Sequence, residues 1–299
     1  MHLEDPLAPH LSDAARGGRE AMEAILRGVC DDVYGLALRM LWHPEDAADA
    51  TQEILLKVST HLGEFRGESA VRTWVYRIAS NHLLRARERR SRGRTSPIEM
   101  IEAAGDAAAL ADESADDRVL ALEVKLGCSH AMLHALDEEH RLAYILGELL
   151  ELPGAEAAAI LEIQAPAFRQ RLTRARARIR GVMAARCGLV DPSRPCRCER
   201  RVEPARRQGL VDPSALRFAA HPIRGAEVRS LAAYVDALEG LEPTLRVLRS
   251  HPDYAAPGAV LAAIRGILEG THEGTHEGIH DGARDGIHDA GASSDPGPS

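Results

Sequence analysis

The sequence predicts an all-α protein with two small helical domains, a helical C-terminal extension and a disordered tail. Three observations favour this class. Ala, Leu and Arg are abundant among the 299 residues, whereas aromatic residues make up only 3%, which suits helices better than strands. Apolar residues recur at helical spacing in several stretches. Basic residues gather in two blocks with an acidic connector between them.

The charge pattern is more informative than the net charge of −8. Residues 65–94 carry nine Arg and two Glu, and residues 169–186 carry seven Arg and no acidic residue. Residues 96–117, between these blocks, carry seven acidic residues and no basic one. Two basic blocks separated by a flexible acidic connector make a pattern that the net charge conceals, although Arg abundance alone is weak evidence for nucleic-acid binding.

The N-terminal segment has neither the basic region nor the apolar core of a signal peptide, so we expect a cytoplasmic protein. No stretch approaches the ~18 apolar residues of a membrane span, so we expect no membrane insertion. Five cysteines, an odd number, favour a reducing compartment over a disulfide scaffold. We expect residues up to about Gly18 to form a loose polar tail.

The first two helices are predicted on either side of Trp42-His43-Pro44. Apolar residues at helical spacing predict an amphipathic helix over residues 19–41. Pro44 suits the first turn of the next helix, and the acidic side chains that follow it complement that helix's N-terminal dipole.

The second helix has one apolar stripe and a separate face of mixed chemistry. The stripe consists of Ala47, Thr51, Ile54, Val58 and Leu62. The other face carries Asp49, Gln52, Glu53 and Leu56 at positions that align on one side of a helix. A solvated surface and a docking face for a basic partner both fit this pattern.

The loop of residues 63–70 places Phe65 among two glycines, an arginine and a serine. Phe65 either packs under the loop as a local staple or frames a pocket in which an unpaired base stacks.

The third helix combines a buried side with polar and basic side chains. We expect it to bury Trp74, Val75, Ile78, Ala79 and Leu83, leaving Arg72, Tyr76, Arg77, Asn81 and Arg85 elsewhere on its circumference. An amide, an aromatic ring and several guanidinium groups fit contact with phosphates and exposed bases of single-stranded DNA. A helix that ends basic to suit its dipole would explain one or two arginines, not the whole run to Arg94.

The second basic block has the layout of a helix-turn-helix. A helix over residues 120–136 is followed by Asp137 as an N-cap, and the next helix ends at Pro153-Gly154. A short helix, a turn around Gln164 and a long basic helix that begins near Pro166 complete the motif, whose last helix enters the major groove.

The strings PEDAADATQEILLKV and EFRGESAVRTWVYRIASNHLL resemble region 2 of the extracytoplasmic-function (ECF) group of sigma-70 family factors. These are bacterial initiation subunits that lend promoter specificity to RNA polymerase. The resemblance implies that the acidic helix face binds core RNA polymerase through Asp46, Asp49, Gln52 and Glu53. It implies that promoter DNA at the −10 element is melted and read by Phe65, Arg66, Arg72, Trp74, Arg77 and Asn81. Trp74 also fits the core, so its role there is open.

The string RQRLTRARARIR is similar to sigma region 4, which binds the −35 element. By this resemblance we expect the DNA contacts to come from Arg169, Gln170, Arg171, Thr173 and Arg174. Ala165–Phe168 departs from the small polar residues that the family shows at the start of this helix. The departure puts the base-reading residues and the promoter sequence in doubt.

The C-terminal extension carries Cys187, Cys196 and Cys198 within a dozen residues. We expect ordinary reduced cysteines near a turn, because the spacing is not a CxxC pair. A zinc site completed by His221 or His251, or redox sensing, is the second interpretation. Oxidation between two of the cysteines is the third. Helical patterning continues over three stretches, which form a small bundle or pack back on the preceding domains. Repeated THEG-like units then predict a disordered tail.

These observations predict a sigma factor that its extension regulates, in place of or alongside a separate anti-sigma factor. The expected parts are region 2 (19–94), an acidic linker (95–118), region 4 (119–186), the extension (187–269) and the tail (270–299). The alternative is a stand-alone helix-turn-helix regulator that binds duplex DNA without polymerase. We expect no enzyme, since the chain shows no nucleotide-binding glycine loop or nucleophile motif.

Overall fold

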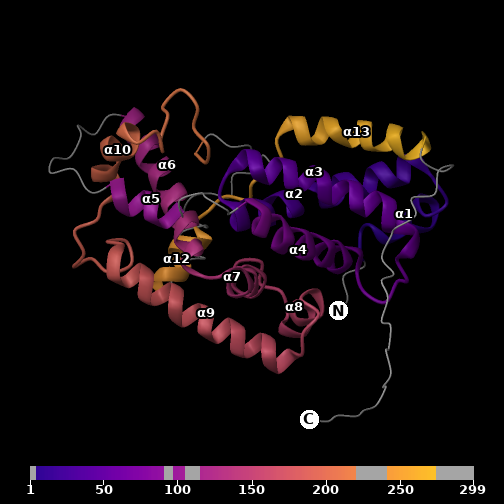
Figure 1. Cartoon of the computed structure of the whole chain (residues 1–299), viewed down its shortest axis with the longest axis horizontal. Helices are drawn as coiled ribbons and strands as arrows, with labels where there is room; N and C mark the ends of the chain where they lie inside the picture. Colours follow the sequence, from indigo (N-terminus) through magenta and orange to yellow (C-terminus); the bar gives the residue numbers. More distant parts are fainter. Residues whose placement is uncertain (1–4, 91–96, 105–114, 220–240, 274–299) are drawn as a thin grey trace, which may run out of the picture.

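The computed structural model describes residues 5–90, 97–104, 115–219 and 241–273. Within these ranges every regular element is a helix, and an isolated β-bridge pairs Cys187 with Cys196. The predicted all-α class is confirmed. Figure 1 shows α1–α4 with α13 on one side of the molecule and α5–α10 with α12 on the other. Every helix in the described ranges is too short or too polar to cross a bilayer.

The first group of helices is built around α2. Its elements are α1 (Ala8–Ala14), α2 (Arg19–Leu41), α3 (Pro44–His61), a 3₁₀ turn (Leu62–Glu64) and α4 (Val71–Arg90). Both α3 and α4 pack against α2 and against each other. All five residues of the stripe predicted for α3 are buried, so the spacing of these residues correctly predicted which face of the helix lies inward.

The prediction of a loose tail up to Gly18 is wrong. Residues 8–14 form α1, which packs against α2 and buries Leu7 and Ala14. The side chain of Asp5 accepts a 2.8 Å hydrogen bond from the backbone N–H of Val71, one of the unpaired donors at the start of α4. This segment therefore belongs to the first group of helices.

The predicted break between α2 and α3 is confirmed at Trp42. Its φ of 69° lies in the left-handed region, where residues other than glycine are uncommon. Pro44 then begins α3. The strained residue has compensating contacts: the ring is buried, and its Nε1 donates a 2.9 Å hydrogen bond to the carbonyl of Gly127 in α6. The break thus also connects the two groups of helices.

The expected acidic linker (95–118) contains regular structure. It includes α5 (Pro97–Ala104) and the first residues of α6 (Ala115–Met132), and α5 packs against α6. Residues 91–96 and 105–114 lie outside the described ranges. The purely flexible connector predicted from composition is therefore corrected for residues 97–104 and 115–118.

The second group follows the predicted order. Its elements after α6 are a 3₁₀ turn (Leu133–Ala135), α7 (Glu138–Tyr144), a π-helical turn (Ile145–Leu149), α8 (Gly154–Ile160) and α9 (Ala165–Arg186). Asp137 caps α7 as expected, since its side chain accepts a 2.9 Å hydrogen bond from the backbone N–H of His140.

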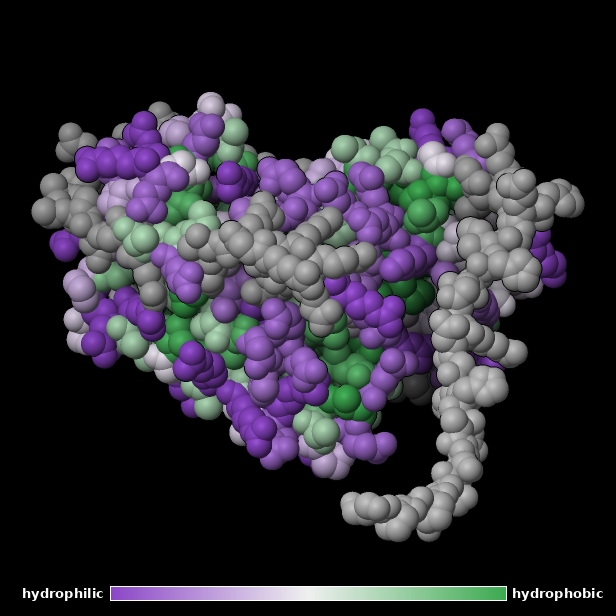
Figure 2. All heavy atoms as spheres, viewed as in Figure 1, coloured by the Kyte–Doolittle hydropathy of each residue, from purple (hydrophilic) through white to green (hydrophobic). Residues whose placement is uncertain are grey.

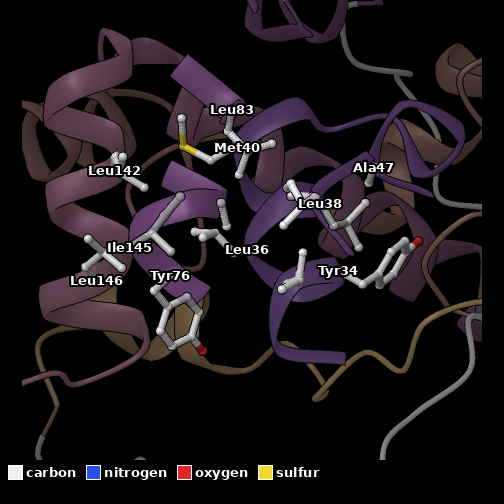
Figure 3. Packing of buried hydrophobic residues seen from close by; sticks show 14 of the residues in the cluster. Tyr34, Leu36, Leu38, Met40, Ala47, Tyr76, Leu83, Leu142, Ile145 and Leu146 are labelled. Carbon is white, nitrogen blue, oxygen red and sulfur yellow. The ribbon is translucent and has the colours of Figure 1, made fainter. Parts of the chain in front are cut away.

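The two groups share one hydrophobic core. Figure 3 shows Leu142, Ile145 and Leu146 facing Met40 and Tyr76 of the first group. Arg141 is fully buried at this junction, where it donates to the carbonyls of Leu133 (3.0 Å), Leu136 (2.6 Å) and Met40 (3.1 Å). A buried guanidinium with three acceptors is stable only in a fixed arrangement, so these contacts hold the two groups together.

The extension packs back on both groups instead of forming a separate bundle. Its described helices are α10 (Cys198–Arg207), α12 (Pro243–Arg249) and α13 (Gly258–Glu273). α10 packs against α6, α12 against α9 and α6, and α13 against α2 and α3. The helix predicted around residues 224–238 and most of the tail lie outside the described residues.

Candidate polymerase and promoter surfaces

The mixed face of α3 points to solvent. Asp49 and Glu53 are exposed, Gln52 is half-buried, and Leu56 is 47% exposed. Asp46 is half-buried one turn earlier. The buried stripe on the opposite side fixes the helix against α2 and α4, so these side chains form a stable outer face. On this face Glu53 lies 3.5 Å from the imidazole of His82, a buried residue of α4.

The loop between α3 and α4 presents Phe65 beside Trp74. Their ring centroids lie 5.4 Å apart with the planes tilted by 58°. Phe65 is half-buried and Trp74 is buried, so the ring pair fits the staple interpretation, while Arg66 is exposed. Gly67 makes the turn at a φ of 73°, which favours glycine.

The −10 residues expected on α4 do not share one face. Arg77 and Asn81 lie one turn apart and are half-buried, and Thr73 precedes them by another turn. Arg72 lies on a different side, where its guanidinium pairs with Asp32 of α2 at 3.2 Å. Trp74 belongs to the core, as its apolar spacing suggested.

α8 lies against the side of α4 that carries Thr73. The Thr73 hydroxyl donates a 2.7 Å hydrogen bond to the carboxylate of Glu156 in α8. Sequence reasoning missed this contact, because the two residues are 83 positions apart and neither belongs to an apolar pattern.

α8, the turn at residues 161–164 and α9 form the predicted helix-turn-helix. Glu162 makes the turn with a φ of 54°, and Phe168 and Leu172 seat α9 in the core. The other side of α9 is basic and exposed, and Figure 2 shows strongly hydrophilic side chains along the lower edge of the molecule.

The five −35 residues differ in their availability. Arg169, Gln170, Thr173 and Arg174 are exposed. Arg171 is half-buried and pairs with Glu139 of α7 at 2.8 Å. Four of the five expected residues therefore lie on the outer side of α9, and the fifth connects α9 to α7.

The extension cysteines gather with a fourth one. All five cysteines are reduced thiols, and Cys187, Cys196 and Cys198 line one cavity together with Cys128 of α6. Burial raises the pKa of Cys198 to about 12, with smaller contributions from Cys187, Glu199 and Cys196. Among the described residues no three His, Cys, Asp or Glu side chains are grouped to hold a metal.

The zinc interpretation is therefore not supported in its tetrahedral form. His251, one of the two proposed fourth ligands, instead lies 2.6 Å from the hydroxyl of Ser129 in a buried cluster. His221, the other, lies outside the described ranges.

Glu123 of α6 is a buried carboxylate whose role sequence reasoning missed. It is 2% exposed, and its carboxylate accepts hydrogen bonds from the backbone N–H groups of Arg217, Phe218 and Ala219 at 2.6–3.2 Å. These donors belong to the extension, so the carboxylate binds the extension to α6.

Comparison with known proteins agrees with this architecture. Residues 27–93 match the family model described as Sigma-70 region 2. The RNA polymerase sigma-H factor of Pseudomonas aeruginosa is 31% identical over 171 residues, which covers 54% of this chain and 85% of the relative. The ECF sigma-E factor of Escherichia coli K12 is 35% identical over 136 residues, covering 44% of this chain and 70% of the relative. This chain belongs to the ECF sigma factors of the sigma-70 family.

Two solved structures are also similar to this sigma factor. One is RpoE in complex with the anti-sigma factor NepR from Bartonella quintana, at 21% identity and a TM-score of 0.39, covering 52% of this chain and 91% of that one. The other is CnrH in complex with the cytosolic domain of CnrY, at 23% identity and a TM-score of 0.43, covering 59% and 96%.

Proposed function

We propose that this sigma factor binds core RNA polymerase through the outer face of α3. The observation that supports this is the exposure of Asp49 and Glu53 around Leu56, an exposed apolar residue on a helix whose other side is fully packed. Carboxylates around an apolar centre suit a partner surface that combines basic and apolar side chains. Gln52 and Asp46 lie at the edges of this face and extend it.

Promoter contacts come from two separate surfaces. At the −10 element, Arg66 contacts phosphates, and Arg77 and Asn81 contact DNA from α4. A flipped base stacks on the exposed part of Phe65, whose ring is supported from below by the buried ring of Trp74. Arg72 supports this surface through its ion pair with Asp32.

At the −35 element, the exposed side of α9 enters the major groove. The side chains that reach the DNA there are Arg169, Gln170, Thr173 and Arg174. Arg171 holds α9 against α7 through its ion pair with Glu139.

The described arrangement is a closed state in which the −10 surface is partly covered. α8 packs against α4. The Glu156 carboxylate accepts the hydrogen bond of the Thr73 hydroxyl, which lies beside the proposed DNA-contacting side chains. Region 4 must move away from α4 before both surfaces bind their promoter elements together. Opening breaks the Thr73–Glu156 bond and, with wider separation, the bond from Arg141 to the Met40 carbonyl.

The C-terminal strap, which we define as residues 241–273, holds this state closed. At its start Arg249 donates to the carbonyl of Glu148 (2.9 and 2.6 Å) and pairs with Glu151 (2.6 Å) in region 4. Further along, the backbone N–H of Ala256 donates to Asp31 of α2 at 2.9 Å.

The strap then continues as α13 along region 2. α13 buries Val260, Ile264 and Leu268 against α2 and α3, and Glu269 pairs with Arg19 at 3.3 Å. Burial of three aliphatic side chains stabilises this contact by several kcal/mol, at about 1.5–3 kcal/mol for each. A segment bonded to both domains opposes their separation, so the extension acts as an inhibitor within the chain.

We place this protein in the cytoplasm, where RNA polymerase acts, as an initiation factor and not an enzyme. A separate anti-sigma factor would act on the open state, because the strap already occupies part of region 2 in the closed one. We keep the proposed roles of region 2, region 4 and the extension with changed bounds: residues 8–14 join region 2, and residues 270–273 belong to α13 of the extension.

Run-off transcription with purified core polymerase tests the proposed function. Full-length protein should co-purify with core enzyme and direct a defined transcript from its promoter, and core enzyme alone should not. Specific binding to duplex DNA without polymerase, and no promoter-dependent transcript with it, would instead identify a stand-alone helix-turn-helix regulator and refute the proposal.

A further inference from the structure

A cavity of about 450 Å³ lies between α6, the end of α9 and the start of α10. Four of the chain's five cysteines line it, and so do two of its six methionines, Met132 and Met183. The cysteines are Cys128, Cys187, Cys196 and Cys198. Six sulfur atoms from separate segments therefore surround one space, which sequence spacing alone did not indicate.

The chemistry of the lining is that of a soft-metal site. No His, Asp or Glu is among the lining residues of this described cavity. Thiolate and thioether ligands select soft ions, whereas Mg²⁺ and Ca²⁺ require oxygen ligands. Val124 and Leu189 also line the cavity, so part of its wall is apolar.

Two of the cysteines lie on neighbouring backbone segments. Cys187 and Cys196 are the partners of the β-bridge, so their backbones lie at about the 4.8 Å separation of neighbouring strands. Hydrogen bonds fix the intervening turn: the carbonyl of Cys187 accepts from Val190 and Asp191, and Asp191 accepts from Ser193. The two thiols are therefore held near each other by the backbone.

The number of grouped ligands determines the class of ion. Because no three ligand side chains of the described residues converge, a tetrahedral Zn²⁺ site is not preformed. A monovalent d¹⁰ ion needs only two thiolates in a linear arrangement, with nearby sulfur atoms as weaker third ligands. Cys198 and Met183 line the same cavity and are candidates for that weaker contact.

Cationic side chains at the cavity match the charge of such a complex. Lys125, Arg186 and Arg201 line it. An ion with one positive charge bound by two thiolates carries a net charge of −1, which these cations balance.

We propose that this cavity binds one soft monovalent d¹⁰ metal ion through Cys187 and Cys196. Binding exchanges protons for metal: two thiols lose their protons to solvent, two metal–sulfur bonds form, and no electrons are transferred. The site lies at the junction of α9 with the extension, and its lining includes none of the polymerase-binding or DNA-contacting residues proposed above.

Titration of the full-length protein with Cu⁺ under nitrogen, in competition with a chromophoric Cu⁺ chelator, tests the proposal. We expect one tightly bound ion per chain. Removal of a residue that only orients a ligand already costs 10–100-fold in affinity, so Cys196→Ser should weaken binding by at least about 100-fold. Cys30→Ser is the matched control, because Cys30 is buried in α2 outside this cavity, and it should bind as the wild type does.

X-ray absorption at the copper edge of the wild-type complex provides a test that needs no variant. Ligation by sulfur alone is expected. Nitrogen or oxygen ligands at the copper would overturn the proposal, and so would binding no stronger than that of the chelator. Equal affinities of Cys196→Ser and wild type would also overturn it. A loss of binding in Cys30→Ser as large as in Cys196→Ser would show an adventitious ion only, with the same consequence.

Discussion

The hydroxyl of Thr73 in α4 donates a 2.7 Å hydrogen bond to the carboxylate of Glu156 in α8. It joins the helix that carries part of the proposed −10 surface to the helix that precedes the recognition helix α9. Two promoter elements at separate places on the DNA require the two domains to separate. The bond therefore reports the closed state directly.

Removing this bond should favour the open state. A hydrogen bond to a charged group contributes about 1.5–3 kcal/mol, so Thr73→Val should increase promoter affinity of the holoenzyme by about tenfold. A double-mutant cycle with Glu156→Gln, read out by promoter binding, measures the coupling between the two residues. Strictly additive effects of the two substitutions would show that the bond does not control opening.

Charge reversal on α3 should prevent polymerase binding. Asp49→Lys with Glu53→Lys places two cations on the face that we assign to a basic partner surface, and like charges across an interface cost several kcal/mol. Co-purification with core enzyme should be lost. Glu199→Lys in α10, an exposed acidic residue far along the chain, is the control and should bind normally. Retention of binding by the double variant would place the polymerase contact elsewhere.

The two arginines on α9 should have different effects. Arg174 is exposed, so Arg174→Ala should weaken −35 binding and lower the slope of its salt dependence by about one ion. Arg171 pairs with Glu139, so Arg171→Ala should lower thermal stability more and the salt slope less. Equal salt slopes for the two variants would contradict the assignment.

Arg141 should be essential for the joint core. Replacing it by Ala leaves three buried carbonyl acceptors without their donor, at about 1–3 kcal/mol each. Arg141→Lys should rescue little, because an ammonium cannot reproduce the planar spread of a guanidinium. Chemical denaturation should show a loss of several kcal/mol in unfolding free energy. A loss below about 1 kcal/mol for Arg141→Ala would mean that its buried bonds contribute little.

Stability should fall in mild acid because of His251. Burial, with smaller contributions from Arg39 and Lys125, holds the pKa of His251 well below its usual value of 6.5. The unfolded chain then binds a proton below pH 6.5 that the folded chain does not, so unfolding free energy falls by up to about 1.4 kcal/mol per pH unit.

Denaturant unfolding at pH 7 and pH 5.5 measures this dependence. His251→Phe should reduce the loss between the two pH values, whereas His61→Gln, at an exposed histidine, should leave it unchanged. The same acid sensitivity in His251→Phe and wild type would assign it to other groups.

The features that follow local rules were predictable from the sequence. The end of α2 at Trp42, the cap at Asp137 and the apolar stripe of α9 each depend on residues within one or two turns. The outer face of α3 was predictable for the same reason. α1 was missed because a helix of seven residues offers too few apolar repeats to recognise.

Contacts between distant segments were not predictable. A charged side chain such as Arg141 is normally placed on the surface, and only its three backbone acceptors explain its burial. Helical patterning in the extension predicted helices there, but nothing in the pattern identified α2 and α3 as the partners of α13. The same holds for Cys128, which joins the extension cysteines only in three dimensions.

The central claim is that the strap keeps a functional sigma factor closed. Run-off transcription at limiting core polymerase tests it, with Ile264→Asp compared with wild type and with Ala262→Asp. Ile264 is a fully buried residue of α13 and Ala262 is an exposed residue of the same helix, so only the first substitution should detach α13. If the closed state loses about 1.4 kcal/mol or more, transcript yield rises about tenfold for Ile264→Asp and is unchanged for Ala262→Asp. Equal or lower yield from a folded Ile264→Asp protein would contradict the claim.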